Sequence, residues 1–238
     1  MKNNSIIFKK VKFTFYSPVS VKIEYSPTGK FINKELFVTE INDTKYIKPE
    51  IKRGTNSIII LTENLKIYYK ETSDGLSPKN LKIWYKFNNT YKRWCYGQKD
   101  HKNLGGSSLD LFKYPKIRGK KLSTGVLSKN GYYVYEDFTY VFWEKDRQWA
   151  VQQFIPGYKT LFFIGYGKDY KLGLKEFSKI FGKIPMIPVW AFGFWYSRYY
   201  AYHQKEFLDL VDKYRKLNIP IDVMVVDTDW RKNVWRQW

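Results

Sequence analysis

The sequence predicts a β-sandwich followed by one βαβ unit, so the chain is of mixed β and α/β class. Short segments of alternating apolar and polar residues follow one another from residue 5 to about residue 165, with no helical stretch among them. After Gly167 the apolar spacing becomes helical. From residue 188 on, two continuous apolar runs enclose an amphipathic segment, a pattern typical of parallel strands joined by a helix.

The predicted strands of the sandwich are short and are separated by turn-forming residues. Val11, Phe13 and Phe15 alternate with polar residues, and Pro27-Thr28-Gly29 is a turn signal. A hairpin is predicted around Asn88-Asn89. The other predicted strands cover residues 19–25, 57–61, 65–69, 81–87, 91–96, 132–135, 139–143 and 161–166.

Residues 97–110 form a long polar segment that does not fit a strand. Loops of this length are often functional, but an ordinary surface loop gives the same pattern, and both interpretations stay open. Gly105-Gly106 does not form a phosphate-binding loop, because no Gly-Lys-Ser/Thr sequence follows it.

A helix is predicted over about residues 169–181, with Asp169 as its N-cap and Gly182 after its last turn. We interpret this helix as a linker at the end of an N-terminal sandwich domain, residues 1–184. A second domain is predicted over residues 185–238. The apolar face of the helix is predicted to comprise Tyr170, Leu174, Phe177 and Phe181.

The second domain is predicted to contain strands at residues 189–195 and 223–226, joined by a helix. The predicted apolar face of that helix comprises Phe207, Leu210, Val211, Tyr214 and Leu217. Ligands of barrels and open parallel sheets lie at the carboxyl ends of the strands. Ser197, Arg198 and Tyr199 follow the first strand, and Asp227 and Asp229 follow the second, so we expect any ligand chemistry at that end. A turn or N-cap after a strand would also explain the two aspartates.

Composition limits the possible classes of protein. Hydrophobic residues make up 44% of the 238 residues and aromatic residues 20%, which excludes a largely disordered chain. The single cysteine excludes an internal disulfide framework, and no apolar run is long enough for a signal peptide or a membrane span. We therefore expect a cytoplasmic protein that does not bind a membrane.

The net charge of +20 raises the question of a nucleic-acid partner. The lysines alternate singly with apolar residues along the predicted strands, as in residues 81–87, and this spreads them over solvated faces. No nucleic-acid partner is expected. Nucleic-acid binding would be recognised as association that weakens steeply with salt.

Motifs for metal, nucleotide and serine chemistry are absent from the sequence. Its two histidines, His101 and His203, form no metal-binding cluster with cysteine, and there is neither a Gly-x-Ser-x-Gly elbow nor a dinucleotide fingerprint. No metal and no cofactor are expected. Many aromatic residues and carboxylates remain, a combination that suits sugar rings and hydroxyls, although most aromatic residues serve the core.

Several segments resemble glycoside hydrolase family 31, the retaining α-glucosidases, α-xylosidases and their relatives. The resemblance is strongest in Pro185–Tyr200, Tyr214–Asp222 and Val226–Trp230, and it extends to Asn103–Gly106 and Gly125–Tyr132. It implies a galactose-mutarotase-like sandwich followed by the start of a (β/α)₈ barrel. It also implies a carbohydrate partner, an α-linked oligosaccharide or glycoside.

The resemblance also implies roles for single residues. Asp227 aligns with the aspartate that binds the sugar in the −1 subsite, and Tyr199 aligns with an aromatic residue at the mouth of the active site. Asp229 and Trp230 would support the end of the second strand. Asp110 lies in a loop that would reach over the pocket.

The sequence departs from the family in its catalytic residues. The nucleophile and the acid/base of the family are aspartates after later barrel strands, and neither motif occurs here, so no catalytic residue is assigned. We therefore expect an N-terminal fragment of a retaining α-glycosidase, from a truncated or frameshifted gene, that is inactive alone. The alternative is a non-catalytic sandwich module that binds carbohydrate or protein.

Overall fold

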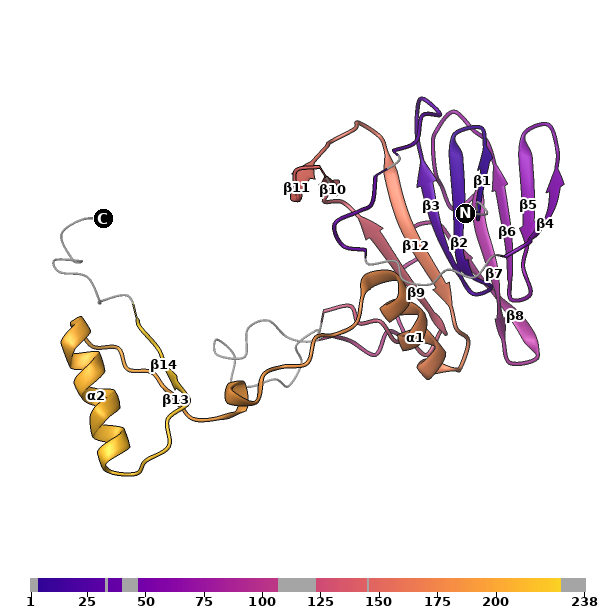
Figure 1. Cartoon of the computed structure of the whole chain (residues 1–238). Helices are drawn as coiled ribbons and strands as arrows, with labels where there is room; N and C mark the ends of the chain where they lie inside the picture. The colour runs from indigo at the N-terminus through magenta and orange to yellow at the C-terminus, as the bar shows by residue number, and fades with distance from the viewer. Residues whose placement is uncertain (1–3, 33, 40–46, 107–122, 145, 228–238) are drawn as a thin grey trace. The chain divides into compact units, whose positions relative to one another are not determined.

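The computed structural model describes residues 4–32, 34–39, 47–106, 123–144 and 146–227. The chain divides into two compact units, Met1–Lys183 and Ile184–Trp238, here called the sheet unit and the C-terminal unit. Strands are the main regular element of the described residues, and helices are few (Figure 1).

The first sheet of the sheet unit has the strand order β1-β2-β3-β12-β9, and all of its neighbours are antiparallel. Its strands are β1 (Ser5–Phe8), β2 (Val11–Ser17), β3 (Ser20–Tyr25), β9 (Tyr132–Asp137) and β12 (Lys159–Gly165). The strands predicted in these regions are confirmed. The pairing of β3 with β12 joins parts of the chain that are far apart in sequence.

The second sheet is an antiparallel meander with the order β4-β5-β6-β7-β8. Its strands are β4 (Glu50–Arg53), β5 (Ser57–Leu61), β6 (Leu65–Lys70), β7 (Leu81–Phe87) and β8 (Thr90–Cys95). The predicted hairpin is confirmed, and Asn88 in its turn has a φ of 54°, a conformation that asparagine tolerates. The sequence did not reveal β4, because all four of its residues are exposed and three of them are charged.

The two sheets pack against each other through a core to which both contribute apolar side chains. Phe163 of β12 is fully buried, and its ring lies 5.4 Å from Trp94, 5.7 Å from Tyr85 and 6.0 Å from Tyr132, measured between ring centroids. Trp94 and Tyr85 belong to the second sheet, and Tyr132 belongs to the first. Phe163 therefore links both sheets in one aromatic cluster.

Helix α1 (Tyr170–Phe181) covers the other side of β12. The centroids of Phe162 and Phe181 lie 5.1 Å apart, and Asp169 caps the helix by accepting a hydrogen bond from the Leu172 amide, as predicted. The predicted apolar face is wrong in part, since Tyr170 and Leu174 are exposed. The buried residues of the helix are instead Gly173, Glu176 and Ile180. Glu176 can face the sheet because its carboxylate accepts a hydrogen bond from the buried Ser20 hydroxyl.

A separate hairpin is formed by β10 (Val141–Glu144) and β11 (Trp149–Gln152). The strand predicted at residues 139–143 corresponds to β10 with its start shifted to Val141. Strand β11 was not predicted, because Trp149 and Gln152 are exposed and the segment lacks a buried apolar face.

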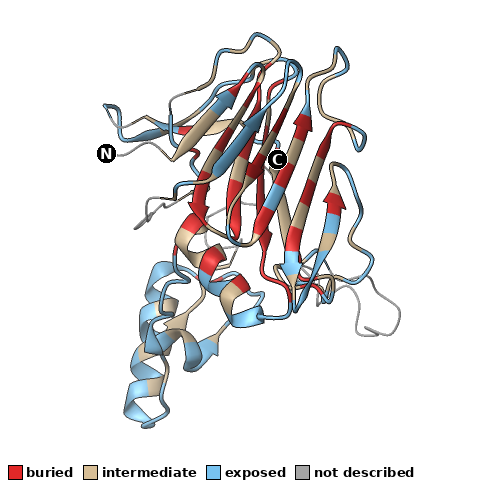
Figure 2. Cartoon of the chain, turned by 90° about the vertical axis from the view of Figure 1, so that its right-hand side faces the viewer, coloured by how far each residue is buried: buried red, intermediate tan, exposed pale blue. Residues whose placement is uncertain are grey.

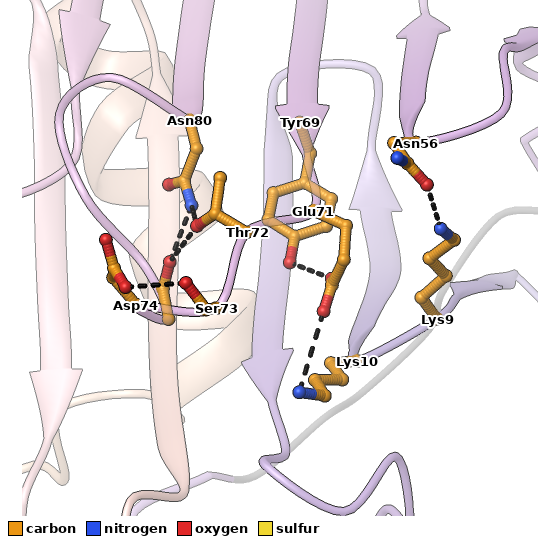
Figure 3. A network of polar contacts seen from close by, with 10 residues as sticks. Lys9, Lys10, Asn56, Tyr69, Glu71, Thr72, Ser73, Asp74 and Asn80 are labelled. Atoms are coloured by element: carbon orange, nitrogen blue, oxygen red, sulfur yellow. Dashed lines mark hydrogen bonds and ion pairs between the residues drawn. The ribbon is translucent and has the colours of Figure 1, made fainter.

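A polar network joins the two sheets at one end (Figure 3). Lys9 and Lys10 lie in the β1–β2 turn of the first sheet; Lys9 donates to Asn56, and Lys10 lies 3.8 Å from a carboxylate oxygen of Glu71. The hydroxyl of Tyr69, a core residue of β6, donates to the same carboxylate of Glu71. Burial and this carboxylate both raise the pKa of Tyr69, which therefore stays a neutral donor.

The C-terminal unit contains η1 (Val189–Phe192), β13 (Trp195–Tyr196), α2 (Gln204–Lys216) and β14 (Val223–Met224). Strands β13 and β14 are parallel, so the predicted strand–helix–strand order is confirmed. The predicted strand at residues 189–195 is wrong over most of its length. Bonds from Ala191 to Pro188 and from Gly193 to Trp190 close a 3₁₀ turn there instead.

The predicted apolar face of helix α2 is only partly buried. Phe207, Leu210, Val211 and Tyr214 are partly covered, whereas Leu217 is exposed. No residue of α2 is fully buried, and Figure 2 shows exposed residues along the helix, in contrast to the buried residues in the strands of the two sheets.

Replacement of Phe163 by alanine is expected to lower the free energy of unfolding of the sheet unit by about 3–5 kcal/mol, because it opens a cavity between both sheets. Chemical denaturation measures this loss. The matched control is Phe154→Ala, because Phe154 is 67% exposed and its removal should cost less than about 1 kcal/mol. Equal losses for the two variants would contradict the assigned core.

Candidate functional site

The carboxyl ends of β13 and β14 lie side by side because the two strands are parallel and pair in register, Trp195 with Val223 and Tyr196 with Met224. Tyr199 follows β13 and is 64% exposed, and Asp227 follows β14 and is half-buried. The structure therefore places these two predicted residues after the same ends of neighbouring strands. Asp110, Asp229 and Trp230, the other three predicted site residues, lie outside the described residues.

A cluster of one arginine and three tyrosines organises the segment after β13. The hydroxyls of Tyr196 and Tyr202 are 2.9 Å apart, and Arg198 donates to the Tyr202 oxygen at 3.5 Å. The guanidinium of Arg198 also lies 4.6 Å from the ring centroid of Tyr200. The hydrogen bond from Tyr196 lowers the pKa of Tyr202, and Arg198 lowers this pKa further. Tyr202 therefore serves as the acceptor that fixes Arg198 beside the strand end.

Asp222 fixes the other end of the parallel pair. Its carboxylate accepts a hydrogen bond from the Phe194 amide at 2.8 Å, while the Asp222 amide donates to the Phe194 carbonyl at 3.0 Å. A Cβ at Gly193 would lie 2.1 Å from this carboxylate, so only glycine fits there. Asp222 is not among the site residues predicted from the sequence. The signal that could have found it is a carboxylate directly before an apolar run, where it can accept a hydrogen bond from a backbone amide.

In the sheet unit, residues 97–106 and 123–131 are held together by hydrogen bonds of two side chains, Asp100 and Asn103. Asp100 accepts from the Lys102 amide, from Ser128 Oγ at 2.9 Å and from Asn130 Nδ2 at 2.7 Å. Asn103 binds both backbone groups of Gly125, at 2.8 Å and 2.9 Å.

These bonds fix both sides of the loop that contains Asp110. The bond from the Lys102 amide to Asp100 and the bond from the Gly105 amide to Asn103 each span two residues, as in Asx turns. Such turns are visible in sequence as Asp and Asn residues within a polar loop, so this signal could have identified Asp100 and Asn103.

Tyr166 anchors the second of these segments. Its hydroxyl accepts a hydrogen bond from the Ser128 amide at 2.6 Å and lies 3.3 Å from the Tyr132 carbonyl. Tyr85 donates to the Asn130 carbonyl at 2.8 Å. Burial raises the pKa of Tyr166 to about 12, although its bond from the Ser128 amide acts in the opposite direction. The phenol therefore remains neutral at physiological pH.

The described part of the chain contains neither a metal-binding cluster nor a helix that could span a membrane. Within it, no group of three or more His, Cys, Asp or Glu side chains is arranged to hold a metal ion. The helices described there are also too short or too polar to cross a bilayer.

The comparisons with known proteins agree with this geometry. The family model described as "Glycosyl hydrolases family 31 TIM-barrel domain" matches residues 184–238, which include β13, α2 and β14. An α-xylosidase of Saccharolobus solfataricus is 25% identical over 208 residues, covering 76% of this chain and 27% of that protein. The chain thus spans about a quarter of the length of this relative.

Two solved structures share the fold. A family 31 dextranase of Flavobacterium johnsoniae, complexed with isomaltotriose, gives a TM-score of 0.58 at 20% identity, over 97% of this chain and 32% of that one. A family 31 α-xylosidase from a soil metagenome, complexed with xylose, gives 0.56 at 14% identity, over 95% of this chain and 41% of that one.

The fold and the matched barrel segment place the chain among relatives of the glycoside hydrolases. Within that class, the chain is related to family 31.

The hydroxyls of two buried tyrosines allow a direct test of this part of the structure. Tyr166→Phe removes a bonded hydroxyl and is expected to lower the free energy of unfolding by about 1–3 kcal/mol, because the buried Ser128 amide loses its acceptor. Tyr132→Phe is the matched control, because the Tyr132 hydroxyl is buried without a hydrogen-bond partner among the described residues. Its removal should be neutral within about 0.5 kcal/mol or stabilising. A larger loss for Tyr132→Phe than for Tyr166→Phe in denaturant titrations would contradict this assignment.

Stability is expected to fall at alkaline pH. Burial raises the pKa of Tyr132 and of Tyr166 to about 12, above the value of about 10 in an unfolded chain. The folded state therefore favours the neutral phenols, and this contribution is complete below about pH 10 and is lost as the pH rises towards 12. Melting temperatures between pH 8 and 12 test this expectation, with Tyr132→Phe predicted to show a shallower fall. An unchanged melting temperature up to pH 12 would refute it.

Proposed function

We propose that this chain supplies the N-terminal sandwich and the first βαβ unit of the (β/α)₈ barrel in a retaining family 31 enzyme that hydrolyses α-glycosidic bonds. The sandwich, of the galactose-mutarotase type, would comprise residues 1–184, and the barrel segment would comprise residues 185–238. The observation that carries this proposal is the match of the family barrel to residues 184–238, the same region in which β13, α2 and β14 form a parallel βαβ unit.

The proposed substrate site lies at the carboxyl ends of β13 and β14. Asp227 accepts hydrogen bonds from sugar hydroxyls, and the exposed ring of Tyr199 lines the entrance. Asp229, Trp230 and Asp110, which lie outside the described residues, stay candidate substrate-binding residues. The substrate is an α-linked glycoside of the xylose or glucose type, in keeping with the xylose and isomaltotriose bound to the solved relatives.

Retaining hydrolysis requires a nucleophilic carboxylate and a second carboxyl group that acts as acid and then as base. No residue of this sequence matches the family motif for either group. The 238-residue chain is therefore proposed to bind α-glycosides without hydrolysing them. A sandwich that acts as a non-catalytic binding module is the second candidate function, and it is favoured by the pocket of the sheet unit described below.

Two assays test the proposed function. The chain should not hydrolyse nitrophenyl α-xyloside or α-glucoside faster than its Asp227→Ala variant, because neither variant contains the nucleophile. Calorimetric titration with methyl α-xyloside and methyl α-glucoside should nevertheless show binding. Turnover that exceeds the Asp227→Ala rate would contradict the proposed inactivity, and the absence of binding to every α-glycoside would contradict the proposed function.

A further inference from the structure

The sheet unit contains a pocket of about 240 Å³ beside the edge strands of its two sheets. Strand β8 contributes Trp94, and β9 contributes Tyr132 and Glu136. Tyr96, Gln98 and Phe138 come from the segments that follow these strands. None of these residues belongs to the proposed substrate site of the C-terminal unit.

Two residues of the inner wall, Trp94 and Tyr132, each have a buried polar atom without a partner among the described residues. Trp94 and Tyr132 are 2% and 3% exposed, and the Trp94 indole nitrogen and the Tyr132 hydroxyl form no hydrogen bond within the described part of the chain. Buried polar atoms normally have a partner, and an unpaired one costs stability. Both atoms are closed to solvent, so a ligand in the pocket would contact the rings of these two residues and not their polar atoms.

The rim of the pocket carries groups that can exchange hydrogen bonds with a ligand. Glu136 accepts from the Tyr96 hydroxyl at 2.9 Å through Oε1, and the same oxygen lies 3.5 Å from Lys159 Nζ. Among the described residues nothing bonds to Oε2, so this oxygen can accept from a ligand. Gln98 accepts from the Cys95 amide through its carbonyl oxygen, and its amide group can donate.

Phe138 supplies an apolar surface beside these polar groups, since it lines the pocket and is 66% exposed. Lys159 offsets the charge of Glu136, and the other carboxylate of the lining, Asp100, already accepts hydrogen bonds from Ser128 and Asn130, which makes the pocket suitable for a neutral molecule. Pockets for drug-sized ligands usually measure about 300–1,000 Å³. A pocket of about 240 Å³ therefore suits one small ring.

We propose that this pocket binds a single neutral pyranose ring, a pentose or hexose unit of an α-glycoside, at a second site separate from the barrel. Phe138 contacts the apolar face of the ring, and Glu136 and Gln98 bind its hydroxyls. The choice of a sugar rests on the proposed function, whereas the existence of a ligand site rests on the pocket, the exposed ring of Phe138 and the polar groups of Glu136 and Gln98.

The experiment follows the indole N–H resonance of Trp94 by NMR while methyl α-xyloside or methyl α-glucoside is added to the full chain. Saturable displacement of this resonance is expected with the wild-type chain. Phe138→Ala should weaken the affinity at least about tenfold, because the ring loses its apolar contact. Glu136→Gln should weaken it about three- to tenfold, because a neutral acceptor replaces a charged one while the partner of Tyr96 is kept.

Three controls locate the effect. Phe154→Ala removes an equally exposed phenylalanine outside the pocket lining, 67% against 66%, and should leave the affinity unchanged. Asp227→Ala should also leave the Trp94 titration unchanged, because it alters the proposed barrel site. Cyclohexanol, a ring with one hydroxyl, should not displace the resonance at the same concentration.

The inference would be overturned by a Trp94 resonance that does not move with either sugar, by equal effects of Phe138→Ala and Phe154→Ala, or by equal binding of cyclohexanol. If sugar binding is lost in Asp227→Ala and the Trp94 resonance never moves, the pocket proposal fails while the proposed function stands. If no sugar binds by any measurement, both fail.

Discussion

Burial of β12 on both faces is the constraint on which the sheet unit depends. Leu161 and Phe163 face the core shared by the two sheets, and Phe162 and Ile164 face the cluster covered by α1. Six of the seven residues of this strand are buried. A strand without a polar face must have packing partners on both sides, and this requirement holds the second sheet on one face of β12 and α1 on the other.

Polar side chains that bind backbone groups give both candidate sites their shape. Asp100 and Asn103 hold two loop segments together in the sheet unit, and Asp222 connects β13 with β14 in the C-terminal unit. An irregular backbone lacks the strand-to-strand hydrogen bonds of a sheet. Side-chain hydrogen bonds from these residues take their place, so each loop keeps a defined conformation. Binding groups in such loops are positioned before a ligand arrives, which reduces the ordering cost of binding.

Much of this fold could be predicted from the sequence, because period-two alternation marks the strands that have one buried face. Strands β4 and β11 escaped prediction since they lack that face, and the strand predicted at residues 189–195 is largely a 3₁₀ turn. The pairing order of the first sheet and the pocket beside Trp94 depend on contacts between distant segments, which periodicity does not contain. The position of Asp227 and Tyr199 after neighbouring strand ends could be predicted because parallel strands place their carboxyl ends together, and their role in binding stays a prediction.

The two sheets differ in how much of the chain must be synthesised before all of their strands are present. Every pair in the β4–β8 meander joins neighbours in sequence, so that sheet requires nothing beyond Cys95. The first sheet pairs β3 with β12, and its hydrogen-bond ladder stays open until Gly165 has been synthesised. During synthesis, the whole β4–β8 meander therefore emerges while one edge of β3 is still unpaired. The meander can offer its apolar face to β1, β2 and β3 before β12 has been synthesised.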